Sequence, residues 1–136
     1  MVGMVGQPYG GIPAKLPGTI QAEEFDLGGE GAGYHDTTPG NVRAEFRVDE
    51  DVDIHSHPDG YNVGWFRAGE YLRYTVSVIS DVKQFDFIFR VASGMTLGSF
   101  RVVSGGTGCD DYTTDLTGVV SVPYTGEYNR YVDLEV

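Results

Sequence analysis

The chain has 136 residues, enough for one domain with its own core but too few for two. Its 20 acidic and 9 basic residues give a formal net charge of −11, and such a surface repels phosphate backbones and anionic lipids, which argues against nucleic-acid and membrane partners. The 20 glycines, 9 tyrosines and 7 phenylalanines favour a turn-rich β fold, and no segment repeats apolar residues at helical spacing over three turns.

The first 17 residues are rich in glycine and proline. This composition predicts a linker or expression-derived lead over residues 1–17, followed by one module over residues 18–136. The start lacks the basic and long apolar regions of a signal peptide, and no apolar run is long enough to span a membrane.

The predicted strands are short, and clusters of Gly, Pro, Asn and Asp separate them. We expect strands at residues 18–25, 44–46, 52–54, 70–79, 84–91, 98–103, 119–122 and 131–136. This spacing is typical of an all-β fold, a β-sandwich of the jelly-roll kind. Within residues 84–91, Phe85, Phe87 and Phe89 alternate, which predicts a strand with a buried aromatic row.

The most informative segment is residues 59–78, where a turn with an aromatic tip precedes an alternating strand. Asp59-Gly60 is a turn dipeptide, and it places Tyr61 at the rim of the predicted scaffold. A tyrosine ring can stack on the C–H face of a pyranose while nearby amides and carboxylates bond the sugar hydroxyls. Tyr61 is therefore a candidate sugar-binding residue.

Several segments, in this order, resemble a family 6 carbohydrate-binding module. The matching blocks are residues 20–25 (IQAEEF), 29–37 (GEGAGYHDT), 46–54 (FRVDEDVDI), 60–65 (GYNVGW) and 69–74 (GEYLRY), with weaker matches at 89–93 and 122–126. The resemblance covers roughly residues 12–136. It implies that a last strand of the family, which carries an asparagine and a calcium-ligand aspartate, is missing here or comes from another chain; an inner strand left unpaired in this way would favour association.

The resemblance also implies a sugar-binding cleft. Tyr61 and Tyr128 would clamp the sugar on both faces, each stacking contact contributing on the order of 1 kcal/mol. Glu50 would accept hydrogen bonds from sugar hydroxyls. The alternatives are a Tyr61 ring that packs on its own loop and a Glu50 that is a solvated charge at a strand end.

A structural calcium site is a second implication. The matching ligands are Gln21, Glu23 and a backbone carbonyl near Arg43. Side chains two apart on a strand share a face, so Gln21 and Glu23 would point the same way. Calcium takes 6–8 oxygens, so water would have to complete this partial site.

Three further features have simpler interpretations. We expect Trp65, the only tryptophan, to lie in the core and not to form a second sugar platform. His55 and His57 have the spacing of a metal pair but lack a third ligand nearby, so solvent-facing histidines are expected. Cys109, the only cysteine, lies in an acidic loop that disfavours the thiolate, which argues against a nucleophile.

The function expected from these residues is that of a non-catalytic, secreted, extracellular polysaccharide-binding module. The resemblance implies that it targets an appended glycoside hydrolase to xylan, β-glucan or agarose. One alternative is a structural or adhesive β-sandwich that makes protein contacts. The other is a small glycoside hydrolase, which would need two facing carboxylates; Asp49 and Glu50 are adjacent and would point to opposite faces of a strand.

Overall fold

The computed structural model describes residues 6–96, 98–106 and 111–136. These residues form two compact units, one containing the described residues up to Asp81 and the other those from Val82 onward. Within them there is no α-helix, and no helix is long and apolar enough to cross a membrane. The all-β prediction is confirmed. Cys109 lies outside the described residues.

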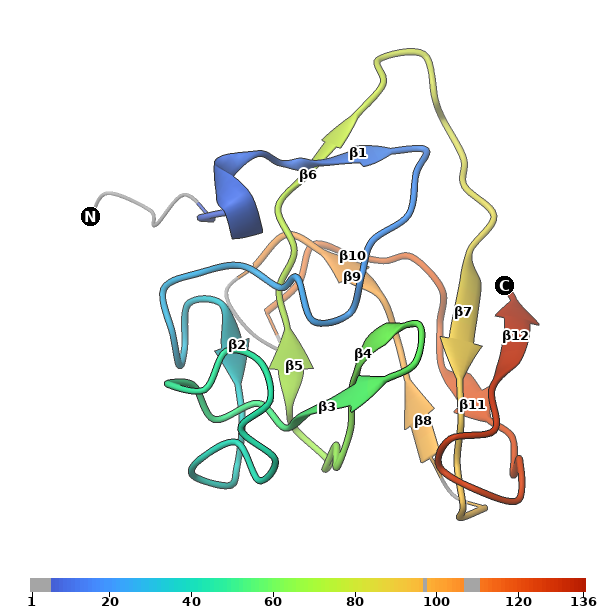
Figure 1. The fold of residues 1–136 in the computed structure, drawn as a ribbon. Coiled ribbons are helices and arrows are strands. Elements are labelled where there is room, and N and C mark those ends of the chain that lie inside the picture. The colour runs from blue at the N-terminus through green and yellow to red at the C-terminus, as the bar shows by residue number, and fades with distance from the viewer. Residues whose placement is uncertain (1–5, 97, 107–110) are drawn as a thin grey trace. The chain divides into compact units, whose positions relative to one another are not determined.

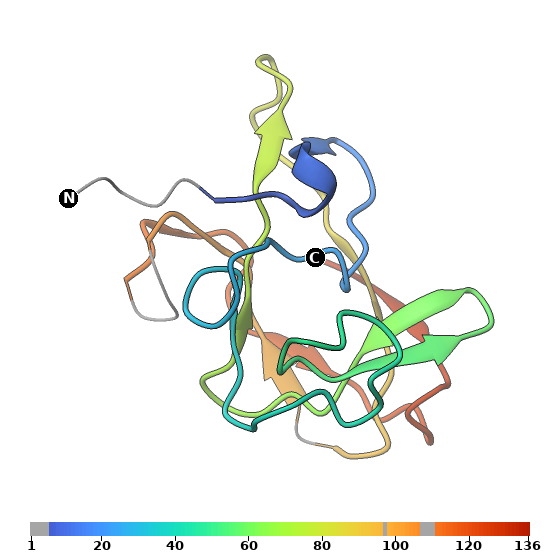
Figure 2. The same ribbon diagram turned by 60° about the vertical axis from the view of Figure 1, so that its left-hand side comes forward.

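The first unit consists of short strands joined in three pairs. Its elements are η1 (Tyr9–Gly11), β1 (Ala14–Leu16), β2 (Tyr34–His35), β3 (Ile54–His57), β4 (Gly60–Val63), β5 (Tyr71–Leu72) and β6 (Val76–Val78). Strand β1 runs parallel to β6, whereas β2 pairs with β5 and β3 with β4 in antiparallel fashion. Figure 1 and Figure 2 both show β3 and β4 side by side as a hairpin.

The β3–β4 hairpin has the turn that the sequence predicts. Residues 58–59 form the turn, and Gly60 follows with φ 134°, a conformation that residues with a side chain rarely adopt. In the hairpin register Ser56 opposes Tyr61, and Ile54 opposes Val63. Ile54 is buried and therefore anchors β3 in the core. Strand β4, which carries the candidate Tyr61, pairs with β3.

A small apolar core holds the first unit together. Phe25, Tyr34, Val52 and Ile54 are buried, and Phe46, Val63, Leu72 and Tyr74 pack against them. The ring of Phe25 meets that of Tyr34 edge to face, with centroids 5.6 Å apart. This core explains why β2, β3 and β5 lie close together despite their short lengths.

Two expected strands of the first unit are wrong, and a third is divided. Residues 18–25 and 44–46 form no strand. Ala44 and Arg47 both have φ 51°, which an extended strand cannot accommodate. The expected strand at 70–79 splits into β5 and β6 because the Thr75 amide donates to the carboxylate of Asp26, 2.7 Å away, and not to a neighbouring strand.

Part of the expected lead is paired with the rest of the unit. Strand β1 lies within residues 1–17, and its residue Leu16 is in register with Val78. Gln7 forms an isolated bridge with Leu27. The boundary at residue 17 stays a prediction, but residues 6–16 contact the module through these backbone bonds.

The second unit is built from three antiparallel pairs. Its strands are β7 (Ile88–Val91), β8 (Gly98–Phe100), β9 (Val103–Ser104), β10 (Thr114–Asp115), β11 (Val120–Val122) and β12 (Val132–Glu135). The pairs are β7 with β12, β8 with β11 and β9 with β10, and the first two are visible in Figure 1. The strands expected at 84–91, 119–122 and 131–136 are therefore present, each shorter than expected.

The predicted aromatic row is present in the second unit. Phe87 stacks on Phe89 with an interplanar angle of 7°, and Phe89 meets Phe100 edge to face with centroids 4.9 Å apart. These rings are half-buried, so the row is less enclosed than the sequence predicts.

Candidate functional site

Tyr61, the first candidate ligand, is held against its own unit. Its ring stacks on that of Phe46, with centroids 4.6 Å apart and an interplanar angle of 25°. The residue is 39% exposed. One ring face is therefore used in packing, on Phe46 and not on the loop of Tyr61 itself as the alternative interpretation has it. Its role as a sugar ligand stays a prediction.

Trp65 lies two residues beyond the end of β4 and is exposed. It is 52% exposed, so the expected core position is wrong. Gly64 donates its amide to the carbonyl of Asp53, 3.0 Å away, and Trp65 then adopts φ 54°. This left-handed residue ends the strand alternation. The indole is consequently presented to solvent and not to the apolar core.

His55 lies beside this exposed indole. The two ring centroids are 6.2 Å apart with an interplanar angle of 64°. His55 and His57 are half-buried, so the solvent-facing prediction is only partly right. His57 lies 3.9 Å from the carboxylate of Asp59, measured from Nδ1 to Oδ2.

Glu50, the predicted acceptor of sugar hydroxyls, is paired with Arg47 in the first unit. Nε of Arg47 lies 2.5 Å from Oε2 of Glu50, and Nη2 lies 3.1 Å from Oε1. The Arg47 and Glu50 side chains are 6% and 19% exposed. This is the bidentate arrangement of a strong carboxylate–guanidinium pair.

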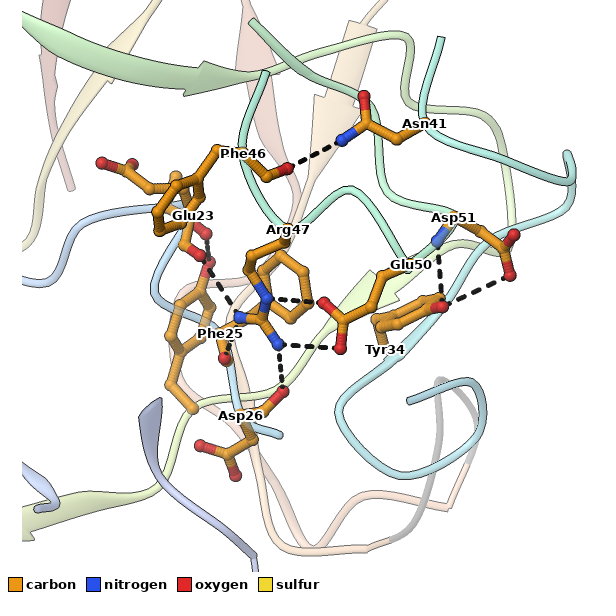
Figure 3. A network of polar contacts seen from close by, with 11 residues as sticks. Glu23, Phe25, Asp26, Tyr34, Asn41, Phe46, Arg47, Glu50 and Asp51 are labelled. Atoms are coloured by element: carbon orange, nitrogen blue, oxygen red, sulfur yellow. Dashed lines mark hydrogen bonds and ion pairs between the residues drawn. The ribbon is translucent and has the colours of Figure 1, made fainter. Parts of the chain in front are cut away.

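Arg47 also ties down a distant segment of backbone, as Figure 3 shows. It donates to the carbonyls of Glu23, Phe25 and Asp26, the first and last at 3.3 and 3.0 Å, and its guanidinium lies 3.5 Å from the centroid of the Phe25 ring. Glu50 therefore neutralises a buried cation that organises residues 23–26. A carboxylate can accept about four hydrogen bonds, so the ligand role of Glu50 is compatible with this pair and stays a prediction.

Other carboxylates near this network are used as acceptors within the fold. Asp51 accepts from the Gly40 amide at 2.7 Å, and the buried Asp53 accepts from the Val42 amide at 2.6 Å. The Tyr34 hydroxyl donates to Asp51 at 3.3 Å. Burial of its hydroxyl raises the pKa of Tyr34, and the charge of Asp51 adds to this effect. These acids hold the loop at residues 40–42 in place, which is a structural use of acidic side chains.

Tyr128 belongs to the second unit and is 67% exposed. Its ring lies on Gly94: a Cβ at position 94 would come 2.7 Å from Cε2 of the ring. The loops that carry these residues are tied together, because the Thr125 amide donates to the Ser93 carbonyl at 2.9 Å. Tyr128 is thus a supported, exposed ring. Because Tyr61 and Tyr128 lie in different units, their predicted clamp on one sugar stays a prediction.

The predicted calcium ligands differ in their environments. Gln21 is exposed, whereas Glu23 is only 8% exposed. Burial raises the pKa of the Glu23 carboxyl, and the nearby Glu24 charge adds to this effect. The Arg43 amide donates to Asn41 Oδ1 at 3.2 Å. Within the described part of the chain, no group of three or more His, Cys, Asp or Glu residues is placed to hold a metal.

A comparison with protein families identifies the class to which this site belongs. The family model described as carbohydrate binding module (family 6) matches residues 44–136, and the chain therefore belongs to that family. The β-sandwich is the fold of this family, so the predicted fold class is confirmed. A search of curated proteins finds no match. The chain is thus a carbohydrate-binding module, and its site is expected to bind and not to cleave a sugar.

Proposed function

We propose that this module binds a polysaccharide of the xylan, β-glucan or agarose class and holds an attached glycoside hydrolase on it. The module would act outside the cell as part of a secreted protein. Tethering raises the effective concentration of substrate near the enzyme without any chemistry in the module itself. The proposal extends the family's carbohydrate-binding activity to a ligand class and a partner.

The observation that carries the proposal is the exposure of two large, supported aromatic rings. Trp65 is 52% and Tyr128 is 67% exposed. Trp65 is bordered by His55, and Tyr128 rests on Gly94, so neither side chain is free to rotate through all orientations. A ring fixed in this way loses little side-chain entropy when a pyranose stacks on it. Trp65 is more exposed than Tyr61, which is 39% exposed, and is therefore the one of these two rings that we propose as a sugar ligand.

Affinity gel electrophoresis tests this proposal. The full chain is run through soluble xylan, laminarin, barley β-glucan and agarose, with and without EDTA. We expect retardation by one of them, weakened by Trp65→Ala and by Tyr128→Ala. Val42→Ala removes an apolar side chain that is 67% exposed, as Tyr128 is, and is the control that should leave mobility unchanged. No retardation by any of these polymers would refute the proposed ligand class.

A double-mutant cycle shows whether Trp65 and Tyr128 act on the same sugar. If both rings contact one bound segment, the combined loss in Trp65→Ala/Tyr128→Ala should differ from the sum of the single losses by at least about 0.5 kcal/mol. If the rings serve independent sites, the losses measured by calorimetry should add. Repeating the cycle with Tyr61→Ala compares Trp65 with the ring that the sequence predicts.

We also propose that Gln21, Glu23 and the Arg43 carbonyl contribute to a structural calcium site. The donor set fits this ion, because amide, carboxylate and carbonyl oxygens are the ligands that Ca²⁺ takes in proteins. The raised pKa of the buried Glu23 carboxyl supports the proposal, since a bound cation would offset the cost of burying that charge. The ion would stabilise the segment that Arg47 also holds and would take no part in chemistry.

A further inference from the structure

A pocket in the second unit lies at the loop that carries Tyr128, and none of its lining residues has been given a ligand role so far. It has a volume of about 390 Å³ and is open to solvent. Its lining residues are Tyr124, Thr125, Gly126, Arg130 and Val132. Tyr124 is 59% exposed and Val132 is 39% exposed, so the pocket combines an aromatic wall with an apolar edge. Its single charged lining group is Arg130.

The electrostatic state of Arg130 differs from that of the other arginines in this unit. Arg90 pairs with Asp133 at 2.9 Å, and Arg101 pairs with Asp115 at 3.0 Å. Within the described residues, the guanidinium of Arg130 has no ion pair or hydrogen bond; its Nη1 lies 3.9 Å from the position that a Cβ of Gly126 would occupy. The fork of donors on Arg130 is therefore available at the pocket.

We propose that this pocket binds the carboxylate of an acidic sugar residue carried on an otherwise neutral polysaccharide. A guanidinium matches a carboxylate with two parallel hydrogen bonds, which are about twice as strong as neutral ones. Tyr124 supplies a ring on which the pyranose can stack, and the pocket has room for one sugar ring. The inference rests on the proposed function and narrows its ligand to uronic-acid-bearing chains.

The negative charge of the protein favours a polysaccharide with isolated carboxylates over one with a carboxylate on every sugar. The formal net charge is −11, so a polymer charged at every residue is repelled by the surface as a whole. Beyond a Debye length of about 8 Å at physiological ionic strength this repulsion is screened. One carboxylate at Arg130 lies next to a guanidinium that has no ion pair within the described residues. Charge and pocket together therefore favour a neutral backbone with occasional acidic side groups.

The test compares one polymer with and without its carboxylates, using the full chain and calorimetry. Glucuronoxylan and its carboxyl-reduced form are the matched pair. We expect the glucuronoxylan to bind about tenfold more tightly, as charge-assisted hydrogen bonds allow. Arg130→Gln should abolish this preference, and Arg130→Lys should retain only part of it because an ammonium lacks the planar fork. Lys83→Gln, which removes the same charge from an exposed position in the unit, should retain the preference.

Three further arms define what overturns the inference. Equal affinity of the unaltered chain for both xylans, or a preference that survives Arg130→Gln, refutes the acidic-sugar site while binding to the neutral form still supports the proposed function. A preference for a sulfated galactan over its desulfated form, without a preference for carboxylates, assigns the pocket to sulfate and refutes the carboxylate. Tighter binding of polygalacturonate than of glucuronoxylan refutes the isolated-charge argument. Binding to none of the polymers refutes both proposals.

Discussion

The pair formed by Arg47 and Glu50 makes a specific prediction for Glu50→Gln. This substitution keeps the shape of the side chain but removes the charge that neutralises a guanidinium of 6% exposure. The glutamine oxygen can still accept from one of the two donors, at Nε or Nη2. We expect the variant to be destabilised, because it leaves a buried cation without its counter-charge.

The contacts of Glu50 set the expected decrease in the free energy of unfolding. One charge-assisted hydrogen bond contributes about 1.5–3 kcal/mol. Removing one partner of a fully buried pair costs about 3–5 kcal/mol, and the 19% exposure of Glu50 reduces that cost. We therefore expect a loss of about 2 kcal/mol. At about 2.1 cal/mol/K per residue for cooperative unfolding of the whole chain, this corresponds to a decrease in melting temperature of about 7 °C.

Thermal and urea unfolding followed by circular dichroism measure this loss. Asp49→Asn changes the same formal charge at the neighbouring exposed position and should alter stability by less than about 0.5 kcal/mol. Calorimetry with the retarding polysaccharide completes the comparison. If Glu50→Gln melts at the same temperature as the unaltered chain but loses sugar affinity, Glu50 is a sugar ligand. The claim that its pair with Arg47 stabilises the fold is then refuted.

Other contacts predict three further outcomes. In Gly94→Ala the new Cβ would lie 2.7 Å from the Tyr128 ring and would displace it. We expect sugar binding to weaken about fivefold, as the loss of one stacking contact would cause. Unchanged affinity in calorimetry would contradict the role of Gly94 in supporting the ring. The hydrogen bond to Glu30 raises the pKa of His35, so the stability from this pair is present below the unfolded pKa of about 6.5 and is lost as pH rises through the higher folded value. The melting-temperature difference between the unaltered chain and His35→Gln should therefore be larger below about pH 6 than above about pH 8, and an equal difference would count against the pair. Calcium should raise the melting temperature of the unaltered chain but not that of Glu23→Gln, and an equal response would exclude Glu23 as a ligand.

The sequence predicts the second unit better than the first. The phenylalanines at alternate positions identify β7, and the segments leading to β11 and β12 follow from short apolar runs between turn residues. These strands pair with antiparallel partners in regular register, as in the match of Leu134 with Phe89. Apolar residues at alternate positions are sufficient to predict a strand where its backbone hydrogen bonds go to a neighbouring strand.

In the first unit the backbone is held by side chains distant in sequence, which local patterns do not reveal. The carbonyls of Glu23, Phe25 and Asp26 accept from Arg47, more than 20 positions later, so this segment forms no strand. The Asn41 side chain similarly accepts from the Ala44 amide at 2.9 Å and donates to the Phe46 carbonyl at 2.9 Å. The residues expected to form a strand at 44–46 therefore form a loop organised by one amide.

Two residues adopt a left-handed backbone conformation, one with a side chain bonded within the fold and one with a side chain exposed to solvent. Arg47 and Trp65 have φ 51° and 54°, a conformation that is costly for residues with a side chain. At Arg47 the bonds to Glu50 and to three carbonyls offset that cost within the fold. At Trp65 the preceding Gly64–Asp53 bond fixes the backbone while the indole is 52% exposed. The cost at Trp65 therefore places the indole toward solvent from a backbone position that the Gly64–Asp53 bond holds, and such preorganisation favours stacking on a sugar.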